Sequence, residues 1–111
     1  MRHTLVRSLV QHFAERAGHQ GAIRVFTRLD EFERLRRRRG YEDGPTNAHR
    51  DLGSTLPGRL PAVLINVGLH ASLAALVRTC AHEAVHVASP DLAHGAEFER
   101  RVRRLIRGGS L

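Results

Sequence analysis

Residues 82–86 and a histidine at position 94 have the residue types and spacing of a hydrolytic metal site. His82 and His86 are four positions apart, and Glu83 directly follows His82. On a helix of about 3.6 residues per turn, residues four apart share one face, so both imidazoles can bind a single ion while Glu83 lies at the edge of that face. This H-E-x-x-H spacing is typical of zinc hydrolases.

A catalytic zinc ion takes three protein ligands and keeps a further position for water. We expect His94 to be the third ligand, with Asp91 and Glu97 as the alternatives. Coordination lowers the pKa of the water from about 15.7 to about 7, so that Glu83 can take its proton as the hydroxide attacks a polarised carbonyl. The pattern therefore predicts one Zn²⁺ per chain and hydrolysis of peptide bonds in a protein or peptide substrate. Imidazole ligands also accept other divalent metals.

The two histidine motifs resemble the signature of a known peptidase group. His-Glu-x-x-His at 82–86, then His-Gly-x-x-Phe at 94–98, is similar to the motif of SprT-like metallopeptidases and the related YgjP-type (DUF45) and WLM groups. The close match covers about the last third of the chain, which lacks the Cys-rich zinc ribbon of longer members, so functions attached to that ribbon are not implied. The resemblance implies that His82, His86 and His94 are metal ligands and that Glu83 is the general base.

The periodicity of apolar residues predicts a single α+β domain spanning 1–111. We expect a minimal zincin-like fold, in which a two- to three-stranded sheet packs on the helix of the histidine motif, with helices at both ends of the chain. The expected strands are Ile23–Leu29, half-buried, and Pro61–Val67, buried on both faces. The expected helices are Thr4–Ala17, a short one capped by Asp30 and ended by Gly40, one from Ser72 to about Ala88, and Gly95–Arg107.

The helix that follows Ser72 is apolar on most sides and should be central. His82, Glu83 and His86 within such a helix would each carry a desolvation cost without a partner, which favours a bound metal. Cys80 should point away from the ion as a small buried residue.

Residues 40–60 contain many glycines and prolines and predict a long loop with a short edge strand around Asn47–Leu52. A zinc peptidase binds substrate in extended form along an edge strand beside the metal helix, so this segment can form a wall of the cleft. Tyr41 or His49 can then donate a hydrogen bond to a developing oxyanion. A surface loop without a chemical role is the alternative for both residues.

The last helix combines an apolar stripe with acidic residues at its start. We expect Phe98, Val102, Leu105 and Ile106 to face inward. Glu97 has two possible roles. We prefer that its carboxylate is stabilised by the helix dipole; the alternative is that it accepts a hydrogen bond from the free N–H of a ligand imidazole.

The chain is strongly basic, with 18 Lys+Arg against 11 Asp+Glu, a net charge of +7, and arginine at every basic position. This balance favours polyanion partners such as nucleic acid, and Arg36, Arg37, Arg38 and Arg39 are the densest positive charge. A solvated helix face, or a bias of coding composition, is the alternative.

The rival hypothesis is thus a nucleic-acid-associated or assembly protein whose zinc site is structural or catalytically weak. Glu83 speaks against it, because a structural site needs no carboxylate between its histidines. A protease brought to DNA by a basic surface would combine both, and would resemble the Spartan-type members of the group.

The lone Cys80 and the absence of long apolar runs bear on location. One cysteine excludes an intrachain disulfide and fits a reducing compartment. Without a run of 18 or more apolar residues or a signal peptide, the sequence predicts a soluble, cytoplasmic protein with no membrane partner.

Overall fold

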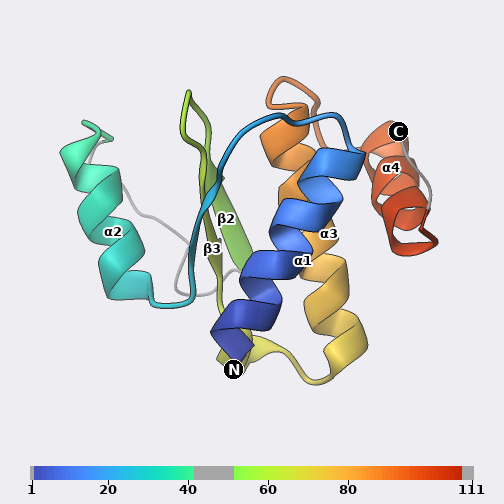
Figure 1. The fold of residues 1–111 in the computed structure, drawn as a ribbon, viewed down its shortest axis with the longest axis horizontal. Helices are drawn as coiled ribbons and strands as arrows, with labels where there is room; N and C mark the ends of the chain where they lie inside the picture. The colour runs from blue at the N-terminus through green and yellow to red at the C-terminus, as the bar shows by residue number, and fades with distance from the viewer. Residues whose placement is uncertain (1, 42–51, 109–111) are drawn as a thin grey trace.

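A small mixed sheet has helices packed on both of its faces (Figure 1). The computed structural model describes residues 2–41 and 52–108. Within them the α+β class expected from the sequence is confirmed, with four helices and a three-stranded sheet. The elements are α1 (Arg2–Arg16), β1 (Arg24–Phe26), α2 (Leu29–Arg38), β2 (Gly53–Leu56), β3 (Ala62–Ile65), a 3-10 turn (Val67–Leu69), α3 (Leu73–Ala88) and α4 (Ala96–Ile106).

Strand β3 is the centre of the sheet, whose order is β1-β3-β2. It pairs parallel with β1 and antiparallel with β2. Val63 and Ile65 belong to the core shared with α1, α3 and α4, whereas Ala62 and Leu64 pack with α2. All four side chains are buried, so the prediction of a strand buried on both faces is confirmed.

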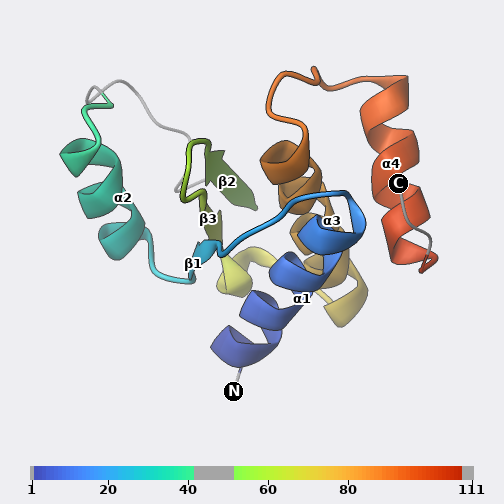
Figure 2. The ribbon, with the colours of Figure 1, turned by 45° about the horizontal axis from the view of Figure 1, so that its top comes forward.

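Helix α3 occupies the middle of the molecule, as expected from its apolar surface. It contacts α1, α4, β2 and β3. Helix α2 covers the opposite face of the sheet, and α4 lies on the side of α3 away from the sheet (Figure 2). The Ser72 hydroxyl accepts a hydrogen bond from the Ala75 N–H at 3.1 Å, the contact of a helix N-cap.

Two predicted helix starts are wrong. Helix α2 begins at Leu29 with Arg28 as its N-cap, because Leu29 packs against the cluster formed by α2 and the sheet. Asp30 lies instead in the first turn, where its carboxylate accepts a hydrogen bond from Arg28 at 3.3 Å. The preceding strand is accordingly shorter than Ile23–Leu29. Thr4 lies inside α1 rather than at its start.

The inward face of α4 is narrower than predicted. Phe98, Val102 and Leu105 are buried, but Ile106 is 41% exposed. The three buried residues follow one another at four- and three-residue intervals and already fill the stripe that faces α3; Ile106 is rotated about 100° from Leu105.

Strand β2 lies within the segment expected to be loop. It covers Gly53–Leu56, directly after the proposed edge strand around Asn47–Leu52, of which residues 47–51 lie outside the described part of the chain. It begins with Gly53 and Ser54, which have little intrinsic strand preference, so pairing with β3 stabilises the extended conformation there. No helix in the described ranges is long and apolar enough to cross a bilayer.

The N-cap of α3 can be tested by replacing Ser72. We expect Ser72→Ala to lower the free energy of unfolding by about 1 kcal/mol, because the Ala75 N–H loses its acceptor. Urea denaturation would measure this loss, and Ser72→Asp, which keeps an acceptor, should stay close to the parent. Equal stability of the alanine variant and the parent would contradict the capping role.

Candidate metal centre

Three histidines from two segments converge at one point of the structure. His82 and His86 project from α3, and His94 comes from the loop before α4. One ring nitrogen from each lies within 4.8 Å of those of the other two. The Nε2 atoms of His86 and His94 are 2.8 Å apart. The histidine cluster found among the described residues contains neither Asp91 nor Glu97, the two alternative ligands.

Phe98 lies against all three imidazoles. Its ring centroid is 4.7 Å from that of His82, 4.6 Å from His86 and 4.9 Å from His94. The phenyl ring is fully buried and belongs to the core between α3 and α4. Packing of this aromatic residue therefore holds the three rings together from the core side.

His82 and His86 have lowered pKa values, which favours the neutral form that binds a cation. Burial, followed by the positive charges that His82 and His94 can carry, lowers the pKa of His86 to about 4. Burial is also the main cause of the lowered pKa of His82, with His94 next. Neutral imidazoles at neutral pH offer the lone pairs that a metal requires.

The donor set fits a zinc ion. Two nitrogens bound at about 2.0–2.1 Å to one tetrahedral ion lie roughly 3.3 Å apart, so His86 and His94 would separate by only about 0.5 Å. Three imidazole donors would leave one coordination position for water, the arrangement found in catalytic rather than structural zinc sites.

Glu83 is a buried carboxylate beside the histidines, with 4% exposure. Thr55 of β2 donates a hydrogen bond from Oγ1 to Glu83 Oε1 at 2.8 Å. Gly53, on the same strand, approaches so closely that an added Cβ would meet Glu83 Oε2 at 2.9 Å. Strand β2 therefore lies directly over the carboxylate.

An open cleft of about 620 Å³ runs between α3 and β2. Part of the 40–60 segment thus forms one wall, and the polar face of α3 forms the other. The lining residues from the loop and α3 are Ala75, Arg78, Thr79, His82, Glu83, His86, Pro90 and His94, and those from the β2 wall are Leu52, Gly53, Ser54, Thr55 and Pro57.

Tyr41 and Cys80, two further residues considered from the sequence, do not line the cleft. Tyr41 is 39% exposed and is not among the described residues that line the cleft. His49 lies outside the described part of the chain. Cys80 is fully buried, and burial, with a smaller effect of the Glu83 charge, raises the pKa of its thiol to about 12, so it is an inert core residue.

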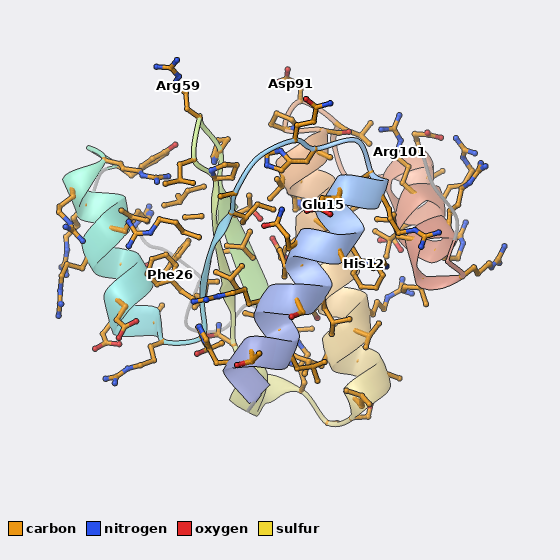
Figure 3. All side chains as sticks on the ribbon, in the orientation of Figure 1. His12, Glu15, Phe26, Arg59, Asp91 and Arg101 are labelled. Carbon is orange, nitrogen blue, oxygen red and sulfur yellow. The ribbon has the colours of Figure 1, made fainter. Side chains whose placement is uncertain are left out.

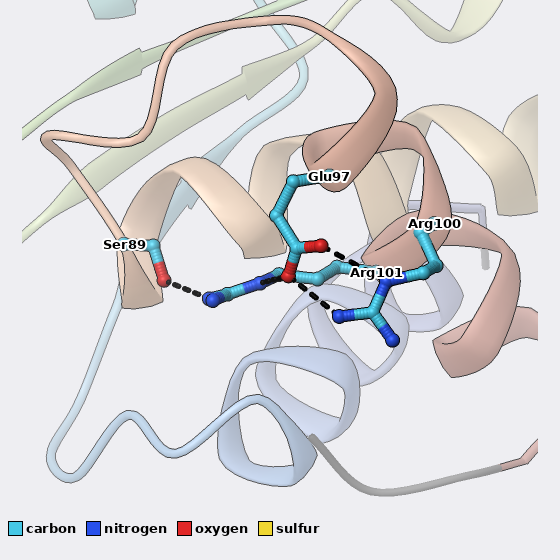
Figure 4. A network of polar contacts seen from close by, with 4 residues as sticks. All are labelled: Ser89, Glu97, Arg100 and Arg101. Atoms are coloured by element: carbon cyan, nitrogen blue, oxygen red, sulfur yellow. Dashed lines mark hydrogen bonds and ion pairs between the residues drawn. The ribbon is translucent and has the colours of Figure 1, made fainter.

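Glu97 is bound by arginines rather than by a ligand imidazole (Figure 4). Its carboxylate accepts hydrogen bonds from Arg100 at 2.7 and 2.9 Å and from Arg101 at 2.9 Å. These hydrogen bonds, that of Arg100 first, lower the pKa of Glu97 to about 2. Arg101 also donates to Ser89 Oγ at 3.0 Å, and so ties the start of α4 to the end of α3. The contact braces the loop that carries His94.

The arginine run of α2 is partly used inside the fold. Arg36 pairs with Glu33 at 3.5 Å, and Arg39 donates to the Leu60 carbonyl at 2.8 Å. Arg37 and Arg38 are exposed. Two of the four candidate nucleic-acid contacts are thus structural braces.

Comparison with protein families, curated proteins and solved structures finds nothing that matches this chain. The case for a metal centre therefore rests on the geometry of its own residues. Sequence reasoning missed Gly53 and Thr55, whose position opposite Glu83 arises only from the pairing of β2 with β3.

The three-histidine centre predicts stoichiometric metal binding. We expect one zinc per chain by elemental analysis, and weakening by more than roughly 100-fold in His94→Ala, because loss of a direct ligand should exceed the 10–100-fold cost of losing a residue that only supports one. His12→Ala is the control, since His12 lies on α1 outside the cleft (Figure 3). Unchanged zinc affinity in His94→Ala would refute this ligand set.

Proposed function

We propose that this protein is a minimal zincin-like, SprT-like zinc metallopeptidase in which Glu83 is the general base. The observation that carries the proposal is the convergence of Glu83 and the three histidines on one open cleft with an edge strand as its opposite wall. A base, a set of nitrogen donors and a binding wall are the parts that peptide hydrolysis requires.

The three histidines and Glu83 have separate roles in the proposed hydrolysis. A zinc ion held by His82, His86 and His94 supplies a Lewis acid that polarises the carbonyl and acidifies water. Glu83 accepts a proton from the attacking water and passes it to the leaving amine, which would otherwise be a poor leaving group. Burial of Glu83 beneath β2 limits competition from bulk water for its oxygens.

Strand β2 supports the binding of an extended peptide. The Asn66 N–H donates to the Leu52 carbonyl at 2.9 Å, which makes this a hydrogen-bonded pair of the antiparallel ladder. Hydrogen-bonded pairs alternate with non-hydrogen-bonded ones, so Gly53 and Thr55 direct their N–H and C=O groups away from β3, toward the edge at which no strand of the described residues pairs. A substrate segment can add to that edge as a further strand.

Replacement of the base separates chemistry from metal binding. We expect Glu83→Gln to keep zinc and to lower kcat on a fluorogenic casein substrate by roughly 10²–10⁴-fold, because only proton transfer is removed. His86→Ala should lose both metal and activity. Retained proteolysis by Glu83→Gln would refute the mechanism.

Nucleic-acid binding is a second candidate function, favoured by the outer face of α4. Arg103, Arg104 and Arg107 are exposed, and the ion pairs found in the described ranges use none of them. Nitrogen-tipped side chains project outward from both α2 and α4 (Figure 3). Free guanidinium groups on one helix face can contact phosphates.

Salt dependence of duplex binding tests this second candidate. Combining Arg103→Gln, Arg104→Gln and Arg107→Gln should lower the slope of log affinity against log salt by about 0.9 per lost phosphate contact. The matched control removes the same charge from α2, through Arg34→Gln, Arg37→Gln and Arg38→Gln. Equal effects of both triple variants would mean that the α4 face has no special role, and that either net charge or the candidate contacts Arg37 and Arg38 on α2 contribute as much.

A further inference from the structure

The edge strand β2 turns two of its residues toward the proposed base. Thr55 and Gly53 are two positions apart and so share a face of the strand, the one toward α3. Leu56 lies on the other face and packs in the cluster that contains Phe32. Because side chains alternate along the strand, the Thr55 hydroxyl and Gly53, which has no side chain, both lie over Glu83.

The Thr55 hydroxyl is a directional hydrogen-bond partner for the buried Glu83 carboxylate. A glutamate has three side-chain torsions, so contacts with neighbouring groups have to set the orientation of its carboxylate. The 2.8 Å contact from Thr55 Oγ1 to Glu83 Oε1 is a charge-assisted hydrogen bond, the stronger kind. It therefore favours the one orientation of the carboxylate in which Oε1 faces Thr55.

Gly53 allows the strand to come close enough for this contact. An added Cβ would lie 2.9 Å from Glu83 Oε2 and 3.0 Å from both Glu83 Cγ and the Leu64 carbonyl oxygen. The last of these atoms is backbone of the central strand and cannot move aside easily. Any side chain at position 53 would push β2 or the carboxylate away.

We propose that Thr55 is a positioning residue that holds the Glu83 carboxylate in the orientation needed for proton transfer, with Gly53 providing the space for this approach. The inference rests on the proposed peptidase function. The backbone groups of the same two residues face the free edge, where the substrate would pair. The base and the scissile peptide are thereby held by one short strand, and their separation is fixed by its geometry.

A matched pair of variants tests the hydroxyl. Thr55→Val keeps the shape and the β-branched strand preference but removes the donor, and Thr55→Ser keeps the donor. We expect Thr55→Val to lower kcat by roughly 10–100-fold with KM nearly unchanged, as misplacement of a reacting group does, and Thr55→Ser to retain most of kcat. Full kcat in Thr55→Val, or equal losses in the two variants, would overturn the positioning role.

A thermal measurement on the metal-free protein gives a readout that does not depend on activity. We expect Thr55→Val to lower Tm by a few degrees in the parent chain, because Glu83 loses a buried donor, and to change it little in a Glu83→Ala background. Equal shifts in both backgrounds would show that the hydroxyl is not coupled to Glu83 and would overturn the inference.

The two proposals fail in different ways. A zinc-loaded parent chain without hydrolysis overturns the peptidase function and the positioning role that depends on it. An active parent chain that loses activity in Glu83→Gln but not in Thr55→Val overturns the role of Thr55 alone.

Discussion

The need to bury most of α3 while keeping three of its polar side chains satisfied governs the rest of the structure. Cys80, Ala84 and Val85 of this helix are fully buried. His82, Glu83 and His86 lie on the same helix, and burial of such groups without partners is costly. The elements around α3 provide these partners. Thr55 of β2 donates a hydrogen bond to the Glu83 carboxylate, and the loop before α4 places His94 beside His82 and His86.

Helix α4 helps to fix His94, the proposed third ligand, which the main fold does not hold directly. His94 is exposed and lies in a loop, where a side chain would ordinarily lose considerable conformational entropy on binding an ion. Phe98 packs against its ring from the core, and the Arg101 guanidinium bridges Ser89 and Glu97. The loop is therefore anchored at both ends, which would lower the entropy cost of binding a metal through His94.

Local sequence signals predicted the helices, the central strand and the proximity of the three histidines. Ser72 as a cap, the apolar run at Ala62–Ile65 and the four-residue spacing of the motif are all short-range features. The partners of Glu83 could not be derived in this way. Gly53 has a weak strand preference, and what Gly53 and Thr55 contact depends on their antiparallel register with β3, a long-range property. The exposed Ile106 has the same origin, since residues on other elements decide which stripe of α4 is covered.

The outward-facing backbone of β2 has a consequence for what the cleft can select. Along this wall a partner would be recognised through main-chain groups, which all residue types share, and the glycine at position 53 presents no side chain of its own. Such a wall would distinguish partners by their backbone conformation. The N–H and C=O groups of a helix are already hydrogen-bonded within the helix, and those of a paired strand in a folded domain are bonded to its neighbours, so neither can pair with β2. Under the proposed function, a folded chain would become a partner by local unfolding, and its folding state, more than its sequence, would decide whether it enters the cleft.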